Sequence, residues 1–328
     1  MPAWLDRRLH DRLLLAATAA LAALVAVLLL GLPHHASGET APAFELAVAD
    51  LRGHALVLLD TADGSRRTIP LPGGPHEMAL LPDGRLVLSL EQSGALAVVD
   101  PASGAVETLA VGGLPHGLAV IGNVLIVTDR SRDVLRRFEL TGRTAADWRE
   151  LVPVPAGHWP HIIAPLPDGE FAVANAGDST LRIGTHLVAA SNTPETLAVS
   201  PTGEVATAGS LGGVVQAFGA DGTLQWQRLV GGRPVRVAYA PDGLTLAVSV
   251  SADGTVALIG PAHVVRTVTV GGAPDGLAFD PSGRFLYVDD LAGGRVSLVD
   301  VAAGTVVATY DAGQTAGAVM LLGPAGGS

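Results

Sequence analysis

The sequence of 328 residues contains no cysteine and no lysine, and aromatic side chains make up only 4% of it. Without cysteine the chain cannot form disulfides, bind a metal through thiolates, or carry haem or lipid on a cysteine. The arginines, which replace lysine throughout, form no stripe along the chain. A formal net charge of −11 makes a nucleic-acid backbone an unfavourable partner.

Several catalytic motifs are absent as well. The chain has no Gly-x-Ser-x-Gly elbow, no His-Glu-x-x-His zinc motif, no Gly-Lys-Ser/Thr phosphate loop and no calcium-loop spacing. Its many paired glycines are typical of turns rather than of nucleotide-binding loops. The sequence therefore marks no nucleophile.

A long apolar run is present near the N-terminus. The segment 13–32 is twenty residues without a charge, and a helix of that length spans about 30 Å, the thickness of a bilayer core. Three arginines at positions 7, 8 and 12 precede the run, and none follows until Arg52. Positive-inside logic then places residues 1–12 in the cytoplasm and the rest in the periplasm or at the cell surface.

Two fates of this segment are open. Residues 13–32 either remain as a transmembrane anchor, or they are a long signal segment that is removed. The small-x-small triplet at 41–43 is the candidate cleavage site, although it lies far from the run and contains a proline. In either case residues 33–43 are predicted to be a polar linker.

A proline recurs at regular intervals along the rest of the chain, in four of six copies directly or one residue after a pair of glycines. The marking residues are Pro75, Pro115, Pro160, Pro194, Pro234 and Pro274, with Thr315 in the equivalent place of a final copy. Their spacings are 40, 45, 34, 40, 40 and 41 residues. A period near 40 with strand-like content predicts a β-propeller with about four strands per blade.

Each copy reads as four short strands. In the clearest copy, residues 276–279 form an apolar run, and the turn Pro281-Ser282-Gly283 follows. Proline fixes φ in such a turn and glycine supplies a positive φ. The next strands are predicted at 285–288, 295–300 and 305–310. These runs are too apolar for a sheet with one wet face, as expected when blades stack on both faces.

The copies predict an all-β, seven-bladed propeller over residues 44–322, followed by a disordered tail at 323–328. Its seventh blade is split between the chain ends: three strands near 45–49, 55–60 and 67–71 join a last strand at 316–322. Sharing one blade between both ends closes the ring and removes free sheet edges.

Two copies depart from the period. The long interval after Pro115 comes from residues 143–150, where Trp148 is either an exposed partner contact or a half-buried cover over a blade edge. The short interval after Pro160 predicts a truncated outer hairpin within 180–191.

The block from Leu286 to Thr309 resembles the YVTN-type, lactonase-like propeller repeat. Tyr287 and Val288 match the first half of the Tyr-Val-Thr-Asn strand that names this family, and two aspartates replace its second half. The resemblance extends over residues 44–322. It implies the propeller fold, whereas function stays open because such propellers include binding proteins, lactonase-like enzymes and metalloproteins.

The residue after each marking proline opens the innermost strand beside the central channel. Around the ring this residue is His76, His116, His161, Glu195, Val235, Asp275 and Ala316. Three imidazoles and a carboxylate suit Zn²⁺ or Cu²⁺. The candidate metal ligands are therefore His76, His116, His161, Glu195 and Asp275, together with His158 three residues before the third histidine.

Two other roles for these residues stay open: the imidazoles could hydrogen-bond backbone and line a wet channel, or they could act on an organic ligand. The loops between second and third strands should lie on the same face. They contain Glu91, Asp129, Arg130, Asn175, Asp178, Asp289 and Asp290. Arg236 is expected to pair with Glu77 or Asp275.

The sequence thus predicts an extracytoplasmic propeller, tethered to the membrane or secreted, that serves as a binding or scaffold module and holds Zn²⁺ or Cu²⁺ as a carrier or chaperone would. The alternatives are a lactonase- or lyase-like enzyme with a rim histidine as general base, and a pure protein–protein scaffold.

Overall fold

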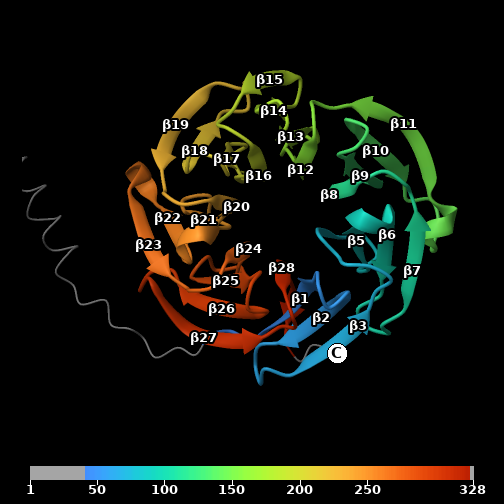
Figure 1. Ribbon diagram of the computed structural model, residues 1–328, viewed down its shortest axis with the longest axis horizontal. Helices are drawn as coiled ribbons and strands as arrows, with labels where there is room; N and C mark the ends of the chain where they lie inside the picture. The colour runs from blue at the N-terminus through green and yellow to red at the C-terminus, as the bar shows by residue number, and fades with distance from the viewer. Residues whose placement is uncertain (1–40, 326–328) are drawn as a thin grey trace, which may run out of the picture. The chain divides into compact units, whose positions relative to one another are not determined.

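A computed structural model describes residues 41–325. In this part of the chain, seven antiparallel sheets of four strands each are arranged around a common axis, which confirms the predicted seven-bladed β-propeller (Figure 1). The predictions on residues 1–12, on the apolar segment 13–32 and on most of the linker concern residues outside the described part of the chain. Among residues 41–325, none of the helices is long and apolar enough to cross a membrane.

The first three blades follow one another along the chain. Blade 1 contains β4 (Met78–Leu80), β5 (Leu86–Leu90), β6 (Ala95–Val99) and β7 (Val106–Ala110). Blade 2 contains β8 (Pro115–Ile121), β9 (Val124–Asp129), β10 (Val134–Glu139) and β11 (Arg149–Pro155). Blade 3 contains β12 (Pro160–Pro165), β13 (Phe171–Asn175), β14 (Thr180–Ile183) and β15 (His186–Ala189).

The next three blades repeat the pattern. Blade 4 contains β16 (Pro194–Val199), β17 (Val205–Gly209), β18 (Val214–Phe218) and β19 (Leu224–Leu229). Blade 5 contains β20 (Pro234–Tyr239), β21 (Leu246–Val250), β22 (Thr255–Ile259) and β23 (Val265–Thr269). Blade 6 contains β24 (Pro274–Phe279), β25 (Phe285–Asp290), β26 (Arg295–Asp300) and β27 (Thr305–Asp311).

The seventh blade joins the two ends of the described chain. It contains β28 (Ala316–Pro324), β1 (Phe44–Asp50), β2 (Ala55–Asp60) and β3 (Arg66–Pro70) in that order. β1 pairs antiparallel with β28, with Val48 opposite Val319. β28 runs two residues beyond the expected end at Leu322, and the Ala325 N–H donates to the Ala43 carbonyl at 3.0 Å.

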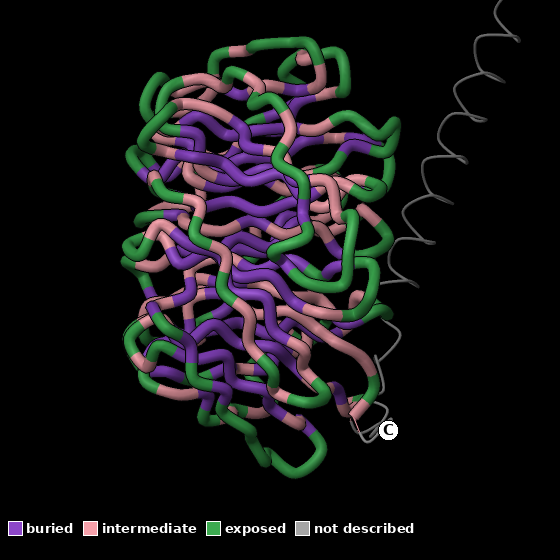
Figure 2. Tube along the Cα trace, turned by 90° about the vertical axis from the view of Figure 1, so that its right-hand side faces the viewer, coloured by how far each residue is buried: buried purple, intermediate pink, exposed green. Residues whose placement is uncertain are grey.

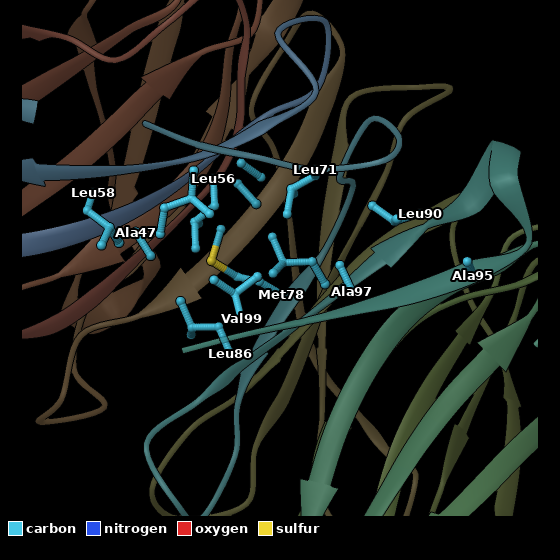
Figure 3. Close-up of a cluster of buried hydrophobic side chains, with 14 residues drawn as sticks. Ala47, Leu56, Leu58, Leu71, Met78, Leu86, Leu90, Ala95, Ala97 and Val99 are labelled. Carbon is cyan, nitrogen blue, oxygen red and sulfur yellow. The ribbon is translucent and has the colours of Figure 1, made fainter. Parts of the chain in front are cut away.

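The ring is sealed by a hydrophobic cluster between the seventh blade and blade 1 (Figure 3). Ala47 and Leu56 of one blade pack there with Leu86 and Leu88 of the other, and all four are fully buried. Burial of a leucine side chain stabilises a fold by roughly 1.5–3 kcal/mol. Buried stretches run through the interior of the molecule, while exposed ones lie at its surface, in loops and in outermost strands such as β3 and β27 (Figure 2).

The sequence explains where the strands sit. Second strands such as β5 and β21 are buried along their whole length because blades cover both faces. Tight turns end the first strands: the Gly283 N–H donates to the Asp280 carbonyl at 2.9 Å, with Gly283 at φ 72°. Glycine reaches this conformation without the strain that other residues meet.

Both irregular copies behave as the sequence suggested. Trp148 follows a short 3₁₀ turn, Ala145–Asp147, and is 8% exposed in a cluster with Leu81 and Phe138, which confirms the covering role. The outer hairpin of blade 3 is short, since β14 and β15 have four residues each. The other 3₁₀ turns are η1 (Glu91–Ser93), η3 (Ser251–Asp253) and η4 (Pro261–His263).

Candidate metal centre

The candidate site lies on one face of the ring. Because all four strands of a blade are antiparallel, the loops between second and third strands share a face with the loops that link successive blades. We call this the histidine face. His116 lies in β8 and His161 in β12, two of the innermost strands (Figure 1). His76 lies just before β4, and its backbone N–H donates to the Ser89 carbonyl in β5.

The three histidines of blades 1, 2 and 3 come together in a row. The ring centroids of His76 and His116 are 4.7 Å apart, and those of His116 and His161 are 4.0 Å apart. The middle residue, His116, is completely buried. The expectation that equivalent positions of neighbouring blades converge at the axis therefore holds for these three side chains.

His116 is held in one orientation by Glu91. Its Nδ1 lies 2.7 Å from Glu91 Oε2, and Arg130 Nη1 binds both oxygens of the same carboxylate at 3.0 Å. Since the carboxylate accepts, Nδ1 carries the proton and Nε2 keeps its lone pair. That Nε2 is buried and has no hydrogen-bond partner within residues 41–325.

Burial keeps the imidazoles of His116 and His161 neutral. It lowers the pKa of His116 well below its usual value, and the neighbouring His76, Arg130 and Arg236 lower it further. The pKa of His161 is lowered well below the usual value for the same reasons, burial first. Neutral imidazole is the form that binds metals. The histidines are thus ready as ligands at neutral pH.

Three donor atoms converge beside the middle histidine. Those of His76, Glu77 and His116 lie within 4.8 Å of one another. Glu77 Oε1 is 4.0 Å from His116 Nε2. Two ligands at about 2.0–2.1 Å from a tetrahedral zinc ion lie roughly 3.4 Å apart. The gap therefore has to close by only about half an ångström for both to bind one ion.

Carboxylates outnumber guanidinium groups around this cluster. Arg236 Nη1 lies 2.9 Å from Glu77 Oε1, and its Nη2 lies 3.4 Å from Asp275 Oδ1, so the expected pairing is confirmed with both partners. Burial raises the pKa of Asp275 and, well above its usual range, that of Asp289, whose neighbour Asp275 raises it further. A cation bound nearby would lower both pKa values again, because it favours the ionised carboxylates.

The other residues proposed as ligands are differently placed. Glu195 forms an ion pair with Arg233 at 3.6 Å, and Asp275 forms one with Arg236 at 3.4 Å. His158 is exposed and its Nδ1 lies 2.9 Å from Asp133 Oδ2, a hydrogen bond that raises the pKa of His158. Neither these three residues nor His161 is part of the donor group of His76, Glu77 and His116 within the described residues.

Glu77 is the donor that the sequence reasoning did not propose as a ligand. It occupies the second position after the marking proline, where Gly117 and Gly276 stand in other blades. A glutamate where the repeat accepts glycine was a usable signal. The copies were compared only at the residue directly after each proline, so Glu77 was not proposed as a ligand.

Several loop residues of this face have a backbone role. Asp129 and Asp290 end their second strands and accept the N–H groups of Leu114 and Ala273, at 3.2 and 2.8 Å. Asn175 does the same for Gly157 at 3.2 Å. These side chains fasten the link between one blade and the next.

The fold is shared with many solved structures. No family model and no curated protein matches the chain. Hydrazine synthase of Kuenenia stuttgartiensis is similar at 21% identity and a TM-score of 0.66, over 74% of this chain and 88% of that one. A protein of Bacteroides uniformis provisionally named a 6-phosphogluconolactonase has 15% identity and a TM-score of 0.70, over 86% of this chain and 100% of that one.

Virginiamycin B lyase of Staphylococcus aureus is also similar, with 13% identity and a TM-score of 0.63, over 77% of this chain and 92% of that one. At these identities the likeness establishes the propeller fold. The resemblance to the YVTN-type family stays a prediction.

Proposed function

We propose that the protein is a metal-binding propeller that holds one divalent transition metal ion, Zn²⁺ or Cu²⁺, on His76, Glu77 and His116. The observation that carries the proposal is the buried Nε2 of His116. It has no partner among the described residues, while Nδ1 of the same ring is fixed by Glu91. A ligating histidine almost always donates its other N–H to a carboxylate or carbonyl in this way.

Charge supports the same proposal. Among the described residues, the carboxyl groups of Glu77, Glu91, Asp275 and Asp289 lie near the guanidinium groups of Arg130 and Arg236. A divalent cation favours the ionised form of the carboxyl groups whose pKa burial raises, whereas an anionic ligand would disfavour it. Because His116 is neutral, metal binding displaces no proton from its Nε2.

A carrier or chaperone role fits a site that lies on one face of a rigid ring. If residues 13–32 tether or export the chain as predicted, the ion is held outside the cytoplasm. The ligands come from loops and strand starts of two neighbouring blades, so the ion can bind without refolding of either blade.

Isothermal titration of Zn²⁺ and Cu²⁺ into metal-free, full-length protein tests this function. Replacement of both His76 and His116 by alanine should weaken the tighter binding at least about 100-fold, more than the loss of an outer partner would. The control is His186→Ala, since this exposed histidine lies in the outermost strand of blade 3. Equal affinity of the double variant and the wild type would contradict the proposal. His10, His34 and His35 remain in every variant, so any metal binding by these three histidines is the same in all the proteins compared.

One alternative has an observation in its favour. A neutral histidine whose Nδ1 is held by a carboxylate is also a suitable general base, and two arginines stand beside it. The similar structures include a lyase and a provisional lactonase. Turnover of 6-phosphogluconolactone or quinupristin by metal-free protein, abolished by His116→Ala, would support an enzyme; no turnover would leave the metal-binding function preferred.

A further inference from the structure

Trp159 has an unusual backbone conformation. It precedes Pro160 in the loop between β11 and β12, on the histidine face, and its φ is +54°. Bulky residues rarely adopt positive φ, because this conformation is strained for any residue with a side chain. Glycine would occupy the same place without this strain, so the backbone alone does not account for a tryptophan here.

Neighbouring loops clamp this residue in place. The Trp159 N–H donates to Asp133 Oδ1 at 2.8 Å, and the Ala176 N–H donates to the Trp159 carbonyl at 3.0 Å. The same Asp133 carboxylate binds the His158 ring at 2.9 Å, and the His158 N–H donates to Asp178 at 2.9 Å. Side chains and backbone of two adjacent blades thus hold one strained loop.

These hydrogen bonds hold the loop so that the indole ring of Trp159 lies against Arg130. The Arg130 guanidinium carbon lies 4.8 Å from the centre of the Trp159 ring, within the range of a cation–π contact. Trp159 is 44% exposed, whereas the Arg130 side chain is only 16% exposed. The indole therefore stands between solvent and the arginine.

A continuous series of contacts leads from this ring to the metal site. Trp159 contacts Arg130, Arg130 binds both carboxylate oxygens of Glu91 at 3.0 Å, and Glu91 binds Nδ1 of His116 at 2.7 Å. An ion pair strengthens when water is kept away from it, and an arginine side chain that is stacked on a ring has fewer conformations available.

We propose that Trp159 is a positioning residue for the metal site. By stacking on Arg130 it keeps Glu91 on Nδ1 of His116, so that the proton stays on Nδ1 and the lone pair of Nε2 faces the ion. This inference rests on the proposed function, although the orientation of His116 can be tested without a metal.

The test compares three variants of the full-length protein. Trp159→Gly removes the ring and suits the backbone, and it should weaken Zn²⁺ binding about 3- to 10-fold. Trp159→Phe keeps an aromatic face and should stay within about 3-fold of the wild type. The matched control is Thr193→Gly, because Thr193 also precedes a marking proline and has φ +56°; its Zn²⁺ affinity should not change.

A double-variant comparison isolates the route through Arg130. If the indole acts through this side chain, Trp159→Gly should add little, less than about 2-fold, to the loss caused by Arg130→Gln alone. Full additivity of the two losses, or an unchanged affinity in Trp159→Gly, would overturn the proposal.

The nitrogen spectrum of His116 separates this inference from the proposed function. In metal-free wild type, long-range ¹H–¹⁵N NMR should show His116 with its proton on Nδ1, and Trp159→Gly should give a mixture of both tautomers. If wild-type protein binds no zinc, the metal function fails, and this spectrum alone decides the positioning role. An unchanged tautomer in Trp159→Gly then overturns the role.

Discussion

At the residue scale, Asp289 of blade 6 differs from Thr128, which occupies the equivalent position in blade 2. Its Oδ1 accepts the Gly276 N–H at 2.7 Å, as the Thr128 hydroxyl accepts the Gly117 N–H at 2.7 Å in blade 2. A hydroxyl is therefore enough for the fold at this position. The second oxygen of Asp289 is buried and lacks a partner among the described residues.

Asp289→Thr should consequently stabilise the metal-free protein. At pH 7.5 the free energy of unfolding is expected to rise by about 1 kcal/mol, because a buried unsatisfied carboxyl is removed and the bond to the Gly276 N–H is kept. Urea unfolding of both proteins measures the difference. A loss of stability would show that this carboxyl has a favourable partner after all.

The buried histidines predict a dependence of stability on pH. An unfolded histidine takes up a proton near pH 6.5, but burial lowers the pKa of His116 and of His161 in the fold. The unfolded state then binds more protons as the pH falls below 6.5, and stability falls with it. At pH 5.5 each histidine should cost about 1 kcal/mol relative to pH 7.5.

His161→Gln, compared with the wild type in chelator-treated buffer, checks this prediction. The variant should lose less stability between pH 7.5 and pH 5.5, by about 1 kcal/mol. The comparison is needed because the Asp133 hydrogen bond raises the pKa of His158, which stabilises the fold as the pH falls. Identical pH profiles of variant and wild type would contradict the buried, neutral state of His161.

At the scale of elements, β28 closes the ring. It forms the innermost strand of the seventh blade, and its partner β1 lies at the other end of the described chain. In the same blade Asp50 accepts the N–H groups of Gln314 and Thr315, both at 2.9 Å. Loss of this strand exposes one edge of β1 and part of the cluster between the seventh blade and blade 1.

Truncation after Ala312 should therefore abolish cooperative unfolding, whereas truncation after Ala325 should leave the melting temperature within a few degrees of the wild type. Circular dichroism during heating distinguishes the two proteins. A cooperative transition in the shorter chain would mean that six blades and three strands are stable without closure.

Strand positions were largely predictable because each depends on local chemistry. Turns that contain proline and glycine separate the strands along the chain. β2, for example, begins and ends at the predicted residues. The truncated hairpin and the covering Trp148 followed from spacing and apolar character. β28 extended further than expected because the Ala325 N–H found a partner in Ala43, far away in the sequence.

The site was less predictable because it depends on distances across the whole ring. Equivalent positions in adjacent blades approach one another, which explains why three histidines of blades 1 to 3 converge. Which carboxylate joins them depends on contacts between blades, and the only signal in the repeat was a glutamate at position 77, where other copies have glycine. Glu195 pairs with Arg233, and Glu77 faces His116. Ion pairs between loops of different blades decide this, and no periodicity in the sequence encodes them.

At the scale of the whole molecule, the central claim is that the ring brings His76, Glu77 and His116 together around one ion. X-ray absorption at the zinc edge, on full-length protein loaded with one equivalent of Zn²⁺, tests it most directly. We expect a first shell of nitrogen and oxygen at about 2.0–2.1 Å, with outer-shell scattering from two imidazoles that is lost in the His76→Ala/His116→Ala variant. An unchanged spectrum in that variant, or a first shell without imidazole, would contradict the account.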